Sequence, residues 1–168
     1  MKKLILTMLL VLLFAVNTQA CITGWILGEP TEVDNPDAQF RAMLGLKMEE
    51  EGEVANVPVG TPEFGIQYDW QGSDGDFDRW GVYGLLHFGD EDAANTWLGR
   101  PFVGMNVTLD VQGNDDANGS AVGAMAGTVY GKIFAVLYQY TAYDGRLEAE
   151  MSEWQDEHRV YAGIVLRF

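Results

Sequence analysis

From Gln39 onward, polar and apolar residues alternate along most of the chain. The clearest run sets Val103, Met105, Val107, Leu109 and Val111 on one face, and on the other Phe102 followed by the polar or small residues Gly104, Asn106, Thr108 and Asp110. Similar runs occupy residues 39–48, 63–70, 79–88 and 159–168. Successive side chains of a strand point to opposite faces, so repeated alternation with period two predicts an all-β fold.

The runs are separated by polar segments rich in Gly, Asp and Asn. These segments cover residues 49–61, 72–78, 89–99 and 112–119. Such residues favour reversals of the chain. Strands joined by short reversals are antiparallel, so we expect one antiparallel sheet.

Residues 120–142 allow two interpretations. Glycines recur every four residues, at 119, 123, 127 and 131, within an apolar stretch. This spacing suits a membrane helix with a close-packing face, but it also falls on one face of a strand. Glycine is poor in helix interiors, and Lys132 would lie mid-span. We therefore favour a strand to Tyr130, a reversal at Gly131-Lys132 and a strand over 133–142.

Two further strands complete the expected sheet. Asp144-Gly145 is a hairpin signal, and the alternation that follows predicts a strand around Leu147–Met151. A turn at 155–157 then leads to the last strand. The sequence thus predicts a barrel of about eight strands over residues 39–168.

The first twenty residues have the pattern of a secretory signal peptide. Lys2 and Lys3 precede an apolar run over 4–16, and small or polar residues lead to Ala20. The run is shorter than the roughly 20 residues of a membrane-spanning helix. We expect cleavage after Ala20 and an irregular lead-in over 21–38, with Trp25–Leu27 as an alternative extra strand.

Cys21 would then be the first mature residue. A cysteine directly after a signal peptide is a lipid-attachment candidate, although the preceding residues lack the large aliphatic side chain usual three places earlier. The alternative is a free thiol, since the chain has only one cysteine.

Alternation alone fits either a soluble β-barrel with its apolar face inside or a membrane barrel with that face outside. Two features favour the membrane. Most runs reach the roughly 9–11 residues that a tilted strand needs to cross the hydrocarbon. Aromatic residues also lie near the ends of runs, where interfacial girdles form: Phe40, Trp70, Trp80, Phe88 and Phe168.

The C-terminus resembles the closing strand of bacterial outer-membrane proteins. Its alternating apolar residues are Val160, Ala162, Ile164, Leu166 and the terminal Phe168. At the level of class, the chain is similar to the small outer-membrane β-barrels of the OmpA, OmpX and OmpW type. That resemblance implies a closed transmembrane barrel in the bacterial outer membrane, contact with its lipid, and recognition by the barrel-assembly machinery.

The net charge of the chain limits the classes of binding partner that we expect. The chain has a formal charge of −15, and loss of the two lysines in residues 1–20 leaves −17. Such a protein repels phosphate backbones, which disfavours nucleic acid. With both termini in the periplasm, residues 49–61 and 89–98 would be extracellular, where their acidity suits cations or a basic partner.

A membrane barrel would turn its charged strand residues inward, where opposite charges can pair, and a barrel of eight strands is just filled by side chains. The residues expected inside are Arg41, Lys47, Asp69, Arg79, Arg100, Asp110, Glu148, Glu150 and Arg167.

Motifs for catalysis or metal binding are weak. Asp74, Asp76 and Asp78 begin like a calcium loop but lack its later glycine and glutamate, so we expect at most weak divalent binding at acidic loops. We interpret His87 as a lumen-facing residue and His158 as a turn residue. Ser152 could serve a lipid-modifying enzyme only with such a histidine, and no serine-hydrolase motif surrounds it.

The sequence therefore predicts no enzyme, metal centre or cofactor. It favours an outer-membrane barrel with a structural, adhesive or narrow-transport, porin-like role. The alternative is an exported soluble β-barrel or sandwich, periplasmic or lipid-anchored, that binds a small ligand.

Overall fold

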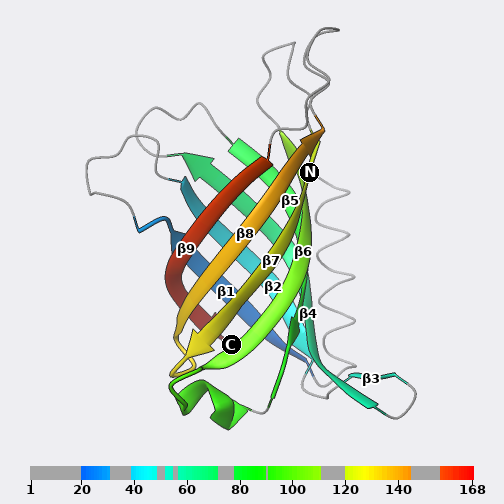
Figure 1. The fold of residues 1–168 in the computed structure, drawn as a ribbon, viewed down its shortest axis with the longest axis vertical. Coiled ribbons are helices and arrows are strands. Elements are labelled where there is room, and N and C mark those ends of the chain that lie inside the picture. Colours follow the sequence, from blue (N-terminus) through cyan, green and yellow to red (C-terminus); the bar gives the residue numbers. More distant parts are fainter. Residues whose placement is uncertain are drawn as a thin grey trace, which may run out of the picture.

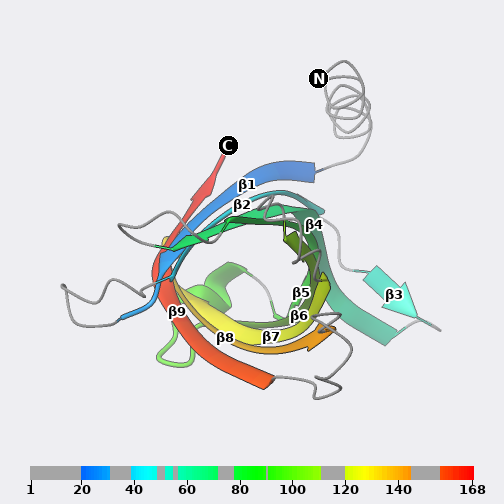
Figure 2. The same ribbon diagram turned by 90° about the horizontal axis from the view of Figure 1, so that it is seen from above.

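The computed structural model describes residues 20–30, 39–48, 52–54, 57–71, 78–89, 91–110, 120–144 and 156–168. Eight antiparallel strands form a closed barrel (Figures 1 and 2). They are β1 (Ala20–Gly28), β2 (Gln39–Met48), β4 (Val57–Gln71), β5 (Asp78–His87), β6 (Arg100–Asp110), β7 (Ser120–Tyr130), β8 (Phe134–Asp144) and β9 (Asp156–Arg167). The barrel closes where β1 pairs with β9, the blue and red strands of Figure 2.

Two short elements lie outside the wall. Strand β3 (Gly52–Val54) pairs only with the first residues of β4, and η1 (Glu91–Asn95) is a 3-10 turn between β5 and β6. Among the described residues, no helix has both the length and the apolar character needed to cross a membrane.

The prediction of an all-β, antiparallel barrel is confirmed, and so is the strand interpretation of residues 120–142. Strands β7 and β8 pair along their whole length and are joined by a tight reversal. Gly131 and Lys132 have φ angles of 55° and 66° there. Two successive positive φ values are the requirement of a type I′ hairpin turn, which matches the twist of the flanking strands.

The expectation of an irregular lead-in was wrong over residues 21–28, which belong to β1. Strand β1 pairs along its whole length with β2 and from Thr23 to Gly28 with β9. Its alternation is hidden because the inward residues Trp25 and Leu27 are as apolar as the outward Ile26. The strand expected at Leu147–Met151 lies outside the described residues, and β8 pairs directly with β9.

Because β1 precedes β2 in the wall, each later connection lies at the opposite end of the barrel from the end expected. Residues 48–57 and 87–100 connect strands at the end where β1 starts and Phe168 lies, here called the terminal end. The expectation that the acidic segments 49–61 and 89–98 lie opposite the termini was therefore wrong. The opposite loop end carries the connections after β1, β4, β6 and β8.

The outer face of the wall is apolar. Exposed large apolar side chains occur on every barrel strand. They include Ile26, Leu44, Phe64, Ile66, Trp80, Val82, Val103, Met105, Val107, Leu109, Val122, Phe134, Tyr138, Val160, Ile164 and Leu166. The side of the wall that meets the surroundings is thus the side that a soluble barrel would keep inside.

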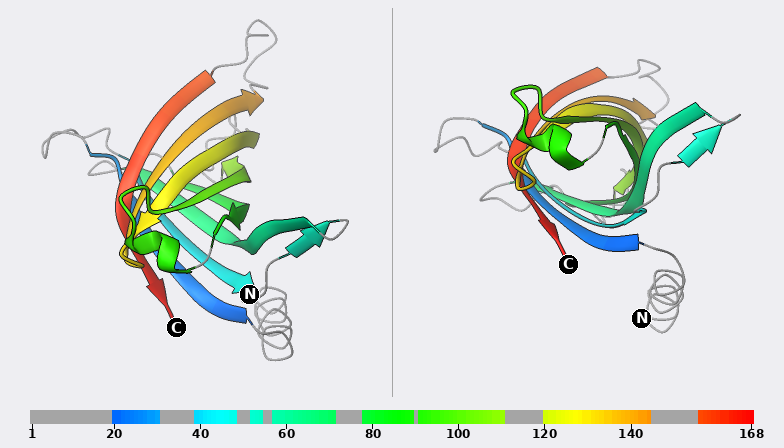
Figure 3. Two further views of the ribbon diagram at one scale, coloured as in Figure 1. Left: turned by 60° about the horizontal axis from the view of Figure 1, so that its bottom comes forward. Right: turned by 90° about the horizontal axis from the view of Figure 1, so that it is seen from below.

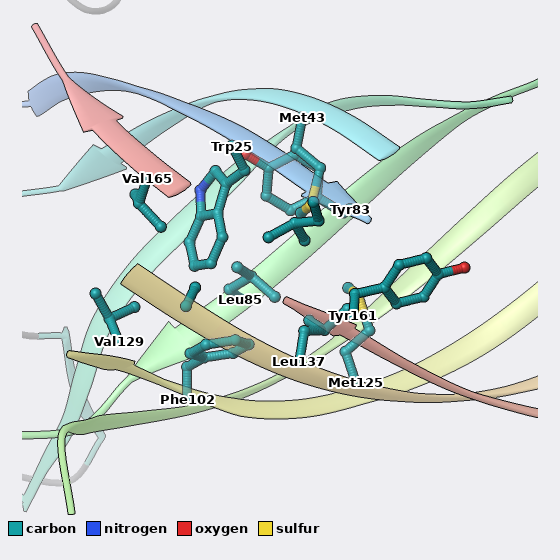
Figure 4. Close-up of a cluster of buried hydrophobic side chains, with 12 residues drawn as sticks. Trp25, Met43, Tyr83, Leu85, Phe102, Met125, Val129, Leu137, Tyr161 and Val165 are labelled. Carbon is teal, nitrogen blue, oxygen red and sulfur yellow. The ribbon is translucent and has the colours of Figure 1, made fainter. Parts of the chain in front are cut away.

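The inner face holds both an apolar cluster and the charged residues. Figure 4 shows Trp25, Tyr83, Phe102 and Tyr161 projecting into the barrel from four different strands. The rings of Trp25 and Phe102 meet edge to face with centroids 5.4 Å apart. Large side chains fill the middle of the lumen, as expected for a barrel of eight strands.

Candidate functional site

Two polar groups of residues lie inside the barrel, one toward each end. The loop-end network centres on Arg41 of β2, which is 1% exposed. Its Nε and Nη2 donate to the two carboxylate oxygens of Asp69 at 2.6 and 2.8 Å. Such a bidentate pair is the strongest geometry available to an arginine and a carboxylate.

Further side chains complete the loop-end network. Arg41 Nη1 donates to Gln139 Oε1, and the guanidinium lies 4.7 Å from the ring centre of Tyr161. Gln67 Nε2 donates to Asp69 at 3.2 Å and its amide oxygen accepts from Asn106 at 3.1 Å. Every ionised group in this network has a partner of opposite charge.

A second ion pair lies beside this network. Arg159 of β9 donates to Glu29 at 2.7 Å, and the other Glu29 oxygen accepts the backbone N–H of Gln39 at 3.0 Å. Glu29 follows β1 directly, so the pair joins three neighbouring strands at the loop end.

The terminal-end cluster is built around Glu63 of β4, which is 1% exposed. One carboxylate oxygen accepts hydrogen bonds from Thr23 Oγ1 at 2.6 Å, Trp25 Nε1 at 2.7 Å and the Tyr83 hydroxyl at 2.9 Å. The other oxygen lies 2.9 Å from His87 Nε2. Four donors from two strands, β1 and β5, hold the buried carboxylate, which a charge of this kind requires.

A glycine makes this arrangement possible. Gly45 of β2 lies against the Tyr83 side chain, and a Cβ at Gly45 would collide with the Tyr83 hydroxyl. The glycine therefore leaves the space through which the hydroxyl reaches Glu63.

The cluster also contains cations that Glu63 does not neutralise. Lys47 is 3% exposed, and its Nζ has no hydrogen-bond partner among the described residues. Lys47 is within electrostatic range of Arg167, Arg100, Glu63 and Glu91. Arg100 donates to Thr61 Oγ1 at 2.9 Å. Among the described residues, the buried part of the terminal end therefore holds two cations, Lys47 and Arg100, and one carboxylate, Glu63.

The β5–β6 connection lies at the mouth of this terminal end (Figure 3). Glu91 of η1 pairs with Arg167 of β9 and lies 3.8 Å from Lys132 in the β7–β8 turn. The carbonyl of Ala94, a residue 4% exposed, accepts the Gly131 N–H at 2.8 Å. These contacts attach the connection to β9 and to the β7–β8 turn.

Several charged residues were correctly predicted to face inward. Arg41, Lys47, Asp69 and Arg100 are buried, and Arg79 and Arg167 are partly buried. Glu148 and Glu150, like the side chain of Asp110, lie outside the described residues. His87 faces the lumen as expected, whereas His158 was wrongly assigned to a turn. It lies on β9, with Nδ1 2.6 Å from the Tyr138 hydroxyl.

The residues singled out at the two ends of the chain lie close together. Cys21 is a partly buried free thiol in β1, opposite Lys47 in the β1–β2 register. Val160, Ala162, Ile164 and Leu166 alternate on the outer face of β9, and Phe168 is 76% exposed. The backbone of Phe168 exchanges two hydrogen bonds with Ile22.

The remaining candidate residues for catalysis or metal binding do not form a site among the described residues. Ser152, Asp74 and Asp76 lie outside the described residues. Within the described part of the chain, no group of three or more His, Cys, Asp or Glu side chains could hold a metal ion.

Sequence reasoning missed the Glu63 cluster. Glu63 was recognised only as a polar residue on the inner face, and Thr23 and Trp25 fell in the supposed lead-in. A carboxylate that must be buried and a tryptophan N–H that needs an acceptor are complementary signals. They become visible only when β1 is placed in the wall.

No family model matches the chain, and no curated protein or solved structure is significantly similar to it. The function must therefore follow from the chemistry of the barrel's two faces.

Proposed function

We propose that the protein is a transmembrane barrel of the bacterial outer membrane, delivered there by the signal peptide in residues 1–20. The observation that carries this proposal is the chemistry of the wall. On the strands, described side chains that face outward are almost all apolar or aromatic, and they include no Asp, Glu, Lys or Arg; the only histidine among them is His158. Soluble proteins rarely expose apolar patches beyond a few hundred Å², whereas lipid requires such a surface.

The height of the apolar surface supports the proposal. Trp80 near the start of β5 and Phe88 directly after its end mark the two ends of an outward-facing row and are 50% and 37% exposed. At about 3.3 Å per residue they are about 26 Å apart along the strand. A tilt of about 40° reduces this to about 20 Å of height, close to the roughly 25 Å apolar band of outer-membrane barrels.

Aromatic rings follow the loop-end rim. Phe40, Trp70, Tyr68 and Trp80 form a continuous row across β2, β4 and β5, with successive ring centroids 5.7, 5.7 and 4.6 Å apart. Tyr138, Tyr140 and His158 form a second group on β8 and β9. Rings with one apolar and one hydrated side favour the interface between lipid and water.

The filled interior favours an anchoring role over transport. Arg41, Trp25, Phe102 and Tyr161 are each 1% exposed inside the barrel. The barrel would therefore hold the acidic connections of the loop end at the cell surface, in a structural or adhesive role without enzymatic activity. The loop-end connections 29–38, 72–77, 111–119 and 145–155 contain many acids and one basic residue, Arg146.

An exported soluble β-barrel is the alternative, and a single substitution separates the two. Met105 is 63% exposed near the middle of β6. In a soluble barrel, Met105→Arg would change stability by less than about 0.5 kcal/mol. In a membrane barrel, arginine at mid-depth costs about 2–4 kcal/mol and falls to about 0–1 near the interface.

Ile133→Arg is the matched control, because Ile133 is equally apolar and 59% exposed but lies in the terminal-end turn. We expect Met105→Arg to reduce the folded fraction in lipid vesicles, measured by the gel shift between unboiled and boiled samples, while Ile133→Arg folds like the wild type. A soluble protein with no heat-dependent gel shift would refute the membrane proposal.

A further inference from the structure

The geometry points to a binding site for a small, proton-carrying oxyanion such as hydrogen phosphate, at the terminal end of the lumen between Lys47 and His87. The inference is independent of membrane location, because it rests only on groups inside the barrel.

The first observation is the unsatisfied ammonium of Lys47. A buried charge without a hydrogen-bonding partner is costly, so native proteins pair such groups or supply a ligand. Lys47 is 3% exposed, and its Nζ has no hydrogen-bond partner among the described residues. The ammonium offers three donors and therefore requires acceptor oxygens.

The described carboxylates near Lys47 are already occupied. Glu63 receives hydrogen bonds from Thr23, Trp25 and Tyr83 on one oxygen and contacts His87 with the other. Glu91 pairs with Arg167 and Lys132 at the mouth. Both described carboxylates within electrostatic range of Lys47 are therefore committed to other groups. An added anion would supply the missing acceptors.

The second observation is the imidazole of His87, which selects among anions. Its Nε2 lies 2.9 Å from a carboxylate oxygen of Glu63, so Nε2 carries the hydrogen. In the neutral ring Nδ1 is then an acceptor, and this buried atom has no partner among the described residues. Hydrogen phosphate offers oxygens to Lys47 and an O–H group to Nδ1, whereas sulfate at neutral pH offers oxygens alone.

The test is thermal unfolding of the full protein, folded in phospholipid-free detergent micelles, with sodium phosphate, sodium sulfate or sodium chloride at equal ionic strength. At a phosphate concentration 100 times the Kd, the unfolding midpoint should rise by about 5–10 °C relative to chloride. Sulfate should give a smaller rise.

Lys47→Met removes the ammonium and keeps the length of the side chain, so the phosphate effect should disappear. Lys132→Met is the matched control, because Lys132 is an exposed lysine at the same end, and it should retain the effect. An equal rise in Lys47→Met, or no rise in the wild type, would overturn the site. A sulfate effect as large as that of phosphate would overturn the selection by His87.

A phosphate group could also come from a lipid. Micelles without phospholipid contain no lipid phosphate, so a response there assigns the site to a free anion. Stabilisation that appears only after phosphatidylglycerol is added would overturn that assignment.

Discussion

At the loop end of the lumen, the Arg41 guanidinium meets a carboxylate, an amide oxygen and an aromatic ring, whereas at the terminal end the Lys47 ammonium meets no hydrogen-bond acceptor among the described residues. Both side chains project from β2, six residues apart. One strand therefore carries a fully paired charge at one end and an unsatisfied charge at the other.

The difference indicates different roles for the two ends. A paired network in a region of low dielectric fixes side chains and has no vacancy for a ligand. An unpaired donor keeps part of its interaction energy available for a ligand. The loop-end network is thus suited to holding the barrel rigid, and the terminal-end cluster is suited to binding.

Breaking the pairing at the loop end should give the largest effect. Asp69→Asn keeps the side-chain volume but removes the carboxylate that pairs with the buried Arg41, and we expect it to reduce the free energy of unfolding by about 3–5 kcal/mol. Urea unfolding in lipid vesicles would measure the change. The double variant Arg41→Met/Asp69→Leu should recover most of the loss, and a single variant as stable as wild type would contradict the assigned pairing.

Removing the charge of Glu63 should have a smaller effect. Glu63→Gln keeps an oxygen for Thr23, Trp25 and Tyr83 but weakens the hydrogen bonds and faces His87 with an amide. We expect a loss of about 1–3 kcal/mol in the same unfolding experiment. The terminal end also becomes more positive, so added phosphate should stabilise this variant more than wild type. An unchanged response to phosphate would separate Glu63 from the proposed site.

The smallest effect should come from the contact of Glu91 at the mouth. Partial burial acts to raise the pKa of the Glu91 carboxyl, but the charge and hydrogen bond of Arg167, aided by Lys47 and Lys132, outweigh it and lower the pKa below the ordinary 4.5. The stabilisation is therefore fully present above pH 4.5 and is lost as the pH falls through the lowered pKa of the folded state.

Hydrogen exchange at the Gly131 amide reports this contact, because that N–H donates to the carbonyl of Ala94, which lies in η1 with Glu91. Exchange relative to its intrinsic rate should accelerate as Glu91 becomes protonated. Glu91→Gln should show the faster relative exchange at neutral pH, and protection equal to wild type in this variant would show that Glu91 does not hold the connection in place.

The sequence was sufficient to predict the all-β fold, the antiparallel wall and the turn at Gly131-Lys132, because outward residues alternate with polar or small ones on most strands. It failed at β1, where Trp25 and Leu27 make the inner face apolar as well. The predicted inward position of Lys47 was correct. Its lack of a partner could not be foreseen, since this depends on which strands contribute the facing side chains.

The seam between β1 and β9 has a consequence for biogenesis. Gly24 faces Leu166 and Trp25 faces Val165 across it, so the first and last described strands complete the wall only with each other. Until β9 has been delivered, β1 and β8 present unpaired backbone edges, which lipid could not satisfy in the proposed membrane location. Closure therefore cannot proceed in step with synthesis. A stalled or truncated chain would be left as an open sheet, vulnerable to proteolysis and to pairing with other copies.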